Sequence, residues 1–187
     1  MEYVEPIKDI EKINEIKQLL KQQSERDYLF FVIGINTGIR ISDLLNIKVE
    51  DIWDGKIVKE FLYVTDPKTN QVYTFYLNTM VKVALENYLS QNEFQQTNFL
   101  FKSKKNDLPI TRQQAYRIIN KVAKQVGIQE KIGTHTLRKT FGYHAYRKGI
   151  AISILKSIFN HVTSSETLRY IGIDKHDNQP VKVDVNL

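Results

Sequence analysis

The stretch GTHTLRKTF, residues 133–141, sets an imidazole and a guanidinium three residues apart, where a helix is expected to begin. Thr134 is a good N-cap residue, so we expect His135 in the first helical turn and Arg138 one turn further on. Both side chains would then share one face at a helix N-terminus, where backbone N–H groups and the helix dipole favour an anion. Taken alone, the stretch fits either a phosphate-binding site or an exposed helix start whose basic residues happen to align.

Apolar residues recur at helical spacing over most of the chain, which predicts a mainly helical fold. The segment RDYLFFVIGINTG, residues 26–38, is apolar nearly all round and is expected to be a buried helix ending at Gly38. ISDLLNI, residues 41–47, adds a helical turn or two. The other expected helices span about residues 8–23, 78–90, 111–126, 134–148, 152–160 and 165–171.

The pattern changes between residues 56 and 77. KIVKEFLYVTD and QVYTFYL are rich in β-branched and aromatic residues, and PKTN between them has the composition of a turn. We therefore expect an antiparallel hairpin with Lys68 at its tip, and NFLFKS, residues 98–103, could be extended as well. The expected fold class is α+β, mainly helical, in a single domain over residues 1–187.

The composition excludes several classes of protein. A chain of 187 residues with 42% hydrophobic residues has room for one core of ordinary size. It contains no cysteine, which excludes disulfide frameworks and thiolate zinc sites. No apolar run approaches the roughly 20 residues of a membrane span, and the first residues lack the pattern of a signal peptide. We therefore expect a cytoplasmic protein.

Positive charge is concentrated in one part of the chain. Residues 1–101 carry 11 Lys and Arg against 15 Asp and Glu, whereas residues 102–161 carry 13 against 2, a balance of +11. Clustered charge of one sign repels itself and a polyanion relieves that repulsion, so a nucleic acid is the expected partner. The alternative is a solvated basic surface. The candidates for DNA contact are Lys102, Lys104, Lys105, Arg112, Arg117, Lys121 and Lys139.

Further candidate residues lie outside the central stretch. Arg40 follows the buried helix in TGIRISDLL, where it is expected beside a cleft. Asp43, three residues on, could hold the Arg40 guanidinium by a bidentate pair. FNHVTSSETLRYIGI supplies His161 and, nine residues later, Tyr170. Each of these residues alone is more often structural than catalytic.

In combination, the order Arg40, Lys68, His135-x-x-Arg138, His161 and Tyr170 resembles the catalytic domain of the tyrosine recombinase (phage integrase-like) family. The matching stretches, which span most of the chain, are TGIRISDLL, DPKTNQVYTFYL, HTLRKTF and NHVTSSETLRYI. The resemblance implies that Arg40 and Arg138 clamp a DNA phosphate, to which His161 donates a hydrogen bond. It also implies that Tyr170 attacks the phosphate to give a 3′-phosphotyrosyl link, with His135 as base and Lys68 protonating the leaving 5′-oxygen. The resemblance further implies double-stranded DNA as the partner, with association with the nucleoid when bound, and it implies no metal, ATP or other cofactor.

The chemistry of such a cleavage requires a set of this kind. The transition state carries extra negative charge, which two arginines and a histidine suit. A tyrosine with an ordinary pKa near 10 is only about 0.1% phenolate at pH 7, so a base or a strongly cationic pocket must activate it. Metal-dependent cleavage is the weaker model, because the only carboxylates in residues 102–161 are Asp107 and Glu130.

The sequence departs from the family in two turns and at its start. Asn160 stands where family members commonly have glycine before the last histidine, and Asn70 stands where glycine often follows the hairpin threonine. Asparagine tolerates the left-handed backbone of such turns, so we expect the same turns here. About 36 residues precede the first motif, so we expect no separate N-terminal core-binding domain, in either a fragment or a standalone catalytic domain.

Three functions remain open from the sequence. They are a site-specific recombinase or integrase, an enzyme that relaxes or resolves DNA as type IB topoisomerases do, and a non-catalytic DNA-binding or assembly module. Complete exchange cuts four strands with one nucleophile per chain, so we expect a homotetramer on DNA and a monomer without it. Residues 172–187, which include the alternating VKVDVNL, are expected to dock onto a neighbour by β-addition.

Overall fold

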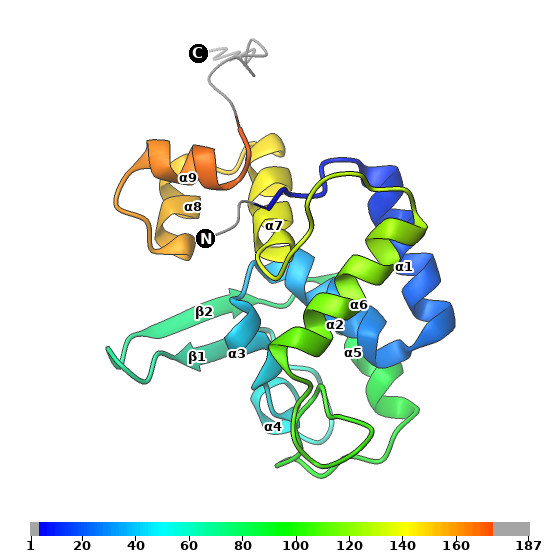
Figure 1. Ribbon diagram of the computed structural model, residues 1–187. Coiled ribbons are helices and arrows are strands. Elements are labelled where there is room, and N and C mark those ends of the chain that lie inside the picture. The colour runs from blue at the N-terminus through cyan, green and yellow to red at the C-terminus, as the bar shows by residue number, and fades with distance from the viewer. Residues whose placement is uncertain (1–3, 174–187) are drawn as a thin grey trace, which may run out of the picture.

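The protein, seen in a computed structural model that describes residues 4–173, is mainly helical with one small antiparallel sheet (Figure 1). This confirms the predicted fold class. The docking tail predicted at residues 172–187 lies outside the described residues from 174 onward. The elements are α1 (Ile10–Gln23), α2 (Glu25–Thr37), α3 (Ile41–Leu45), α4 (Val49–Ile52), β1 (Phe61–Thr65), β2 (Val72–Tyr76), α5 (Thr79–Ser90), α6 (Arg112–Gln125), α7 (Thr136–Arg147), α8 (Ile152–Phe159) and α9 (Ser164–Tyr170).

Helix α2 is the centre of the main core. It contacts α1, α5 and α7, and its residues 29–34 are buried in an unbroken run. A helix that is apolar on all sides is stable only when other elements cover it all round, so the neighbouring helices pack around α2. The helix ends at Gly38, as predicted, with a left-handed φ of 66°. A side chain there would also collide with α7, because an added Cβ would lie 2.3 Å from Phe141 Cδ1.

The hairpin forms where the sequence places it. Strands β1 and β2 pair antiparallel from Phe61 opposite Tyr76 to Thr65 opposite Val72. The turn is closed by a backbone hydrogen bond from Asp66 N to Gln71 O of 2.9 Å, and Asn70 adopts a positive φ of 53°. The left-handed turn expected at Asn70 is therefore present. Figure 1 shows that the turn end of the hairpin projects away from the helical body.

Helices α8 and α9 share a small core of their own. Leu155, Phe159 and Ile171 are buried together in this second core, apart from the main one. The core lies against Gly142 of α7, where an added Cβ would lie 2.5 Å from Ile171 Cγ2. Asn160 ends α8 with a left-handed φ of 57°, so the turn expected at this asparagine is present. The last two helices thus pack on α7 at Gly142, with Phe141 and Ala145 of α7 beside the same core.

Some local expectations were wrong. The strands begin at Phe61 rather than near residue 56, and the short helix α4 was not anticipated. Residues 98–103 form isolated pairings, Lys48 with Phe99 and Lys102 with Pro109, instead of a strand. Within residues 4–173, no helix has both the length and the apolarity that crossing a membrane requires.

Candidate active site

Helix α7 begins two residues later than its sequence suggests. It starts at Thr136, and His135 occupies the N-cap position without capping the helix through its side chain. The prediction of Thr134 as the cap is wrong, because Thr136 closes the turn: its Oγ1 accepts a hydrogen bond from Gly133 N at 3.0 Å. His135 and Arg138 nevertheless both emerge from the start of α7.

Arg138 is a buried cation that joins two helix ends. Only 6% of its surface is exposed. Its Nη1 donates a hydrogen bond to the carbonyl oxygen of Gly38 after α2, and its Nη2 donates to that of Ile158 in α8 at 3.1 Å. The guanidinium carbon lies 4.7 Å from the centre of the Phe159 ring. Burial lowers the pKa of Arg138, but an arginine stays protonated at any physiological pH.

Arg40 lies against the hairpin rather than against Asp43. Its guanidinium carbon is 5.1 Å from the centre of the Tyr73 ring, and its Nη1 is 3.7 Å from Oδ2 of Asp66. The predicted bidentate pair with Asp43 is absent among the described residues, because the hairpin folds over Arg40 and supplies both of these partners. Asp43 still interacts electrostatically with both arginines. Burial raises the pKa of Asp43, while the charges of Arg40 and Arg138 lower it.

Tyr170, the last residue of α9, turns its ring into the site. The ring centre is 4.9 Å from that of His161 and 5.3 Å from that of Phe159. Burial raises the pKa of Tyr170, whereas the charge of Arg138, a hydrogen bond from its guanidinium and the charge of Arg40 lower it. The candidate nucleophile is therefore held as a neutral phenol, next to both arginines of its own chain.

The proton of His161 is placed by a threonine. Thr167 is fully buried, and its hydroxyl donates to the carbonyl oxygen of Thr163 at 3.2 Å. Because this hydroxyl has one proton, it accepts from Nδ1 of His161, 3.1 Å away. Nε2 of the neutral imidazole is then an acceptor, and it donates only when the ring is protonated. Burial lowers the pKa of His161, which favours the neutral form in the absence of DNA.

His135 has the environment of a proton acceptor. Its side chain is half-buried, and burial lowers the pKa of His135. The nearby charges of Arg112, Lys139 and Arg138 lower it further. The imidazole is thus neutral near pH 7, as a general base must be before it accepts a proton.

Lys68 is exposed on the hairpin turn, away from the buried part of the site. Its backbone N–H donates to Oδ1 of Asp66 at 2.8 Å. The structure thus brings Arg40, Arg138, His161 and Tyr170 into one group with His135 beside it, and links Lys68 to them through Asp66.

Most of the predicted DNA-contacting residues lie on the surface. Lys104 and Lys105 are exposed on a loop that is closed by a hydrogen bond from Ser103 N to Leu108 O. Lys102 is paired with Asp107, 2.5 Å away. The remaining exposed candidates, all on α6, are Arg112, Arg117 and Lys121.

Lys139 is buried, although it was predicted as a residue that contacts DNA. It is only 5% exposed, and its Nζ donates a hydrogen bond to the carbonyl oxygen of Val4 at 2.8 Å. The same Nζ lies 5.1 Å from the centre of the Tyr170 ring. The N-terminal segment covers it, since Ile7 N also donates to Thr140 Oγ1 of α7. Lys139 therefore supports the interior beside the nucleophile instead of offering a charge to DNA.

Sequence reasoning missed four residues that shape the site. Phe159 lies under the Arg138 guanidinium, and Thr167 orients His161. Asp66 and Tyr73 hold Arg40. Asp66 had a local signal, because aspartate two residues before the turn lysine commonly caps a turn through its side chain. The other three depend on tertiary packing.

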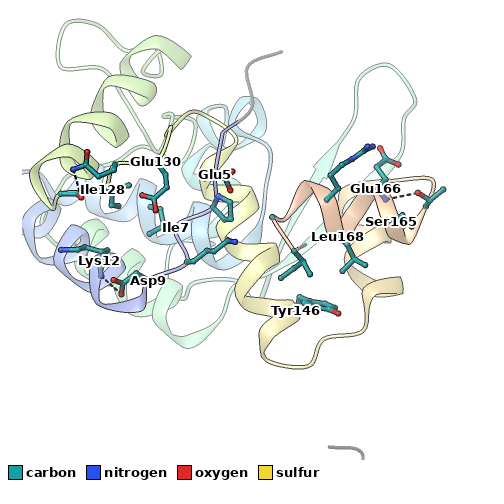
Figure 2. A pocket seen from close by; sticks show the side chains of 18 residues that line it. Glu5, Ile7, Asp9, Lys12, Ile128, Glu130, Tyr146, Ser165, Glu166 and Leu168 are labelled. Carbon is teal, nitrogen blue, oxygen red and sulfur yellow. Dashed lines mark hydrogen bonds between the residues drawn. The ribbon is translucent and has the colours of Figure 1, made fainter. Parts of the chain in front are cut away.

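A cavity of about 1290 Å³ lies away from these residues (Figure 2). It separates the N-terminal segment around Glu5 and Lys8 from α9, where Glu166 and Arg169 line it. Among the residues that line it, none belongs to the six predicted catalytic positions. Within residues 4–173, no three His, Asp or Glu side chains are grouped as metal ligands would be.

Comparison with known proteins identifies relatives of the chain. The model of the phage integrase family matches residues 7–177. The probable integrase/recombinase YoeC of Bacillus subtilis is 42% identical over 175 residues, covering 94% of this chain and 93% of that protein. A tyrosine recombinase of Pseudothermotoga lettingae is 30% identical over 162 residues, and this chain spans 54% of its length. The crystal structure of XerA recombinase shares the fold, with a TM-score of 0.75 at 21% identity over 94% of this chain and 61% of that one.

Proposed function

We propose that this chain, which belongs to the phage integrase family, is a site-specific recombinase that cuts and rejoins double-stranded DNA through Tyr170. The observation that carries the proposal is the packing of the Tyr170 ring, whose centre lies 4.9 Å from that of His161 and 5.3 Å from that of Phe159, the ring against which the Arg138 guanidinium lies at 4.7 Å. The charges of Arg138 and Arg40 both act on this phenol, so it is placed to attack a phosphate that these arginines bind. The relatives' names, integrase and tyrosine recombinase, support the same activity.

Cleavage follows from the groups in the site. The Tyr170 oxygen forms a bond to phosphorus while the bond from phosphorus to the 5′-oxygen breaks, and the phosphodiester is retained as a 3′-phosphotyrosyl link. The phenolic proton passes to neutral His135. Lys68 gives its proton to the leaving 5′-oxygen, so charge and protons balance. Rejoining is the reverse with a new 5′-hydroxyl, and no cofactor takes part.

Binding of a phosphate prepares two of these groups. The anion stabilises the protonated form of His161, whose Nε2 then becomes a donor to a non-bridging oxygen. The raised pKa of Tyr170 keeps the nucleophile unreactive until a base and a phosphate are both in place.

The basic surface supports a long DNA contact. Lys104, Lys105, Arg112, Arg117 and Lys121 are exposed, and Arg112 lies close enough to His135 to lower its pKa. The surface therefore continues from the site along α6. We propose these five residues as phosphate contacts, with binding that weakens steeply as salt rises.

We propose four protomers on DNA for complete exchange and a monomer without it. One chain brings one nucleophile to its own arginines, whereas exchange between two duplexes cuts four strands. Four complete sites are therefore required, one from each chain.

A nicked suicide duplex tests the proposal. The nick lets the short 5′-hydroxyl product diffuse away, so the covalent complex accumulates and appears as a detergent-resistant band. We expect this band in EDTA and without ATP, and strand exchange between two duplexes carrying the site. Relaxation of a supercoiled circle without exchange would favour a topoisomerase-like enzyme. Binding without any covalent band would leave a DNA-binding module and overturn the proposal.

A further inference from the structure

We propose that Asp66 is a positioning residue that couples the phosphate-binding Arg40 to the turn carrying Lys68. This rests on the proposed function of both residues. The two oxygens of this carboxylate hold two different catalytic parts of the site, and a DNA phosphate competes with one of them only.

One oxygen of Asp66 shapes the turn. Oδ1 accepts the backbone N–H of Lys68 at 2.8 Å and lies 3.4 Å from that of Thr69. The backbone of Asp66 also accepts a hydrogen bond from Asn70 N at 2.9 Å. Side-chain capping of this kind fixes a turn that the backbone alone leaves flexible. The position of Lys68 is thus set by Asp66.

The other oxygen faces the phosphate-binding group. Oδ2 is 3.7 Å from Nη1 of Arg40. This is an ion pair but too long for a hydrogen bond, so a phosphate that accepts two short hydrogen bonds from the guanidinium displaces it. The Tyr73 ring, 5.1 Å from the guanidinium carbon, keeps supporting Arg40 after the exchange.

The charges around Arg40 explain why Asp66, and not Asp43, loses its pairing when a phosphate binds. In the DNA-free site, Arg40 and Arg138 are opposed by Asp43 and Asp66, and the field of Asp66 reaches Asp43. A phosphate adds a third anion to two cations. Asp43 lies in α3, within the helical body, whereas Asp66 lies on the projecting hairpin (Figure 1). The carboxylate that gives up its pairing with Arg40 is therefore that of Asp66, and this frees the Lys68 turn to move relative to Arg40 and the bound phosphate.

This coupling makes the position of the general acid, Lys68, depend on whether a DNA phosphate is bound at Arg40. Without DNA, Asp66 ties the hairpin to Arg40 and Lys68 faces solvent. When a phosphate occupies Arg40, Oδ2 is released while Oδ1 keeps the turn formed, so Lys68 is free to reach the leaving oxygen on a turn that is already shaped. The general acid is then delivered only to a site that holds a phosphate.

Two variants separate the roles of the two oxygens. Asp66→Asn keeps an oxygen for the Lys68 N–H but removes the charge that competes with phosphate. Asp66→Ala removes both. In the Tyr170→Phe background, where no cleavage occurs, we expect Asp66→Asn to bind DNA about two- to fivefold tighter at low salt. Unchanged or weaker binding would overturn the competition.

The turn is tested by hydrogen exchange and by the leaving group. Without DNA, the Lys68 amide should exchange faster in Asp66→Ala than in Asp66→Asn. Asp66→Ala should also form the covalent complex about tenfold more slowly. A substrate with sulfur at the bridging 5′ position should restore its rate, because a thiolate leaves without a proton.

The outcomes separate this proposal from the proposed function. Equal slowing of Asp66→Ala on both substrates, or equal slowing of both variants, would overturn the role of Asp66 in placing Lys68. If the wild type forms no covalent complex with either substrate, the proposed function fails. The binding and exchange measurements still decide the Asp66 proposal in that case, since neither needs cleavage.

Discussion

Gly142→Ala is expected to reduce the rate of catalysis far more than it lowers the free energy of unfolding. An added Cβ would lie 2.5 Å from Ile171 Cγ2 and 2.6 Å from Phe159 Cζ, and both residues are buried. Ordinary carbon contacts are about 3.5–4.0 Å, so α8 and α9 must move by about 1 Å. Overpacking of this kind costs about 1–3 kcal/mol, and alanine returns about 1 kcal/mol of helix propensity over glycine. The net loss of stability is therefore about 0–2 kcal/mol.

The effect on chemistry is expected to be larger, because α9 ends at Tyr170 and His161 lies in the loop that joins the two helices that move. A displacement of about 1 Å between reacting groups can cost roughly a hundredfold in rate. We predict that loss in the single-turnover formation of the covalent complex, with DNA affinity nearly unchanged, because the basic residues of α6 do not move. Unfolding by urea measures the stability.

Gly34→Ala is the matched control. Its added Cβ would lie 2.6 Å from Leu137 Cδ1 in the main core, a similar overlap with the flexible end of a side chain. We expect it to keep most of its cleavage rate at a comparable change in stability. Full cleavage by Gly142→Ala, or an equal loss in Gly34→Ala, would refute the view that the contact of α7 with the last two helices sets the position of Tyr170.

Three further predictions concern charges and turns. Burial lowers the pKa of His135 and His161. Below about pH 6.5 the unfolded chain therefore binds more protons than the folded one, and the free energy of unfolding should decrease as the pH falls. A His161→Gln variant in which the slope of this free energy against pH is unchanged would argue against this. Lys139→Met should lower stability by about 1.5–3 kcal/mol through its lost charged hydrogen bond, without changing the salt dependence of DNA binding. Lys121→Ala should instead reduce the slope of log affinity against log salt by about 1 at equal stability, and the reverse pattern would restore Lys139 as a DNA contact. Asn160→Ala should destabilise the protein by about 1–2 kcal/mol at a φ of 57°, whereas Asn160→Gly should not, as thermal unfolding will report.

The sequence predicts those features whose causes are local. Gly38 ends a buried helix, and the asparagines at 70 and 160 adopt the left-handed backbone that their turns require. In each case the residue type and its immediate neighbours determine the conformation, so the pattern is sufficient. The hairpin was predicted for the same reason, although the exact start of its first strand depends on which residues find a partner.

The differences arise from contacts between distant segments. Arg40 pairs with Asp66 instead of Asp43 because the hairpin folds back over the end of α2. Lys139 is buried because residue 4, 135 positions earlier in the chain, accepts its hydrogen bond. Neither contact has a sequence pattern, since each joins segments whose approach is decided by the whole fold.

The mass of one tryptic peptide shows whether Tyr170 is the residue that becomes linked to DNA. After cleavage of the nicked duplex, trypsin and nuclease digestion should leave nucleotides on the peptide of residues 170–175, which contains Tyr170 alone among the ten tyrosines. The peptide of residues 140–147, with Tyr143 and Tyr146, should keep its unmodified mass and serves as the internal control. We expect nucleotides on the first peptide only, and none in Tyr170→Phe. Nucleotides on the second peptide, or a covalent complex that persists in Tyr170→Phe, would contradict this expectation.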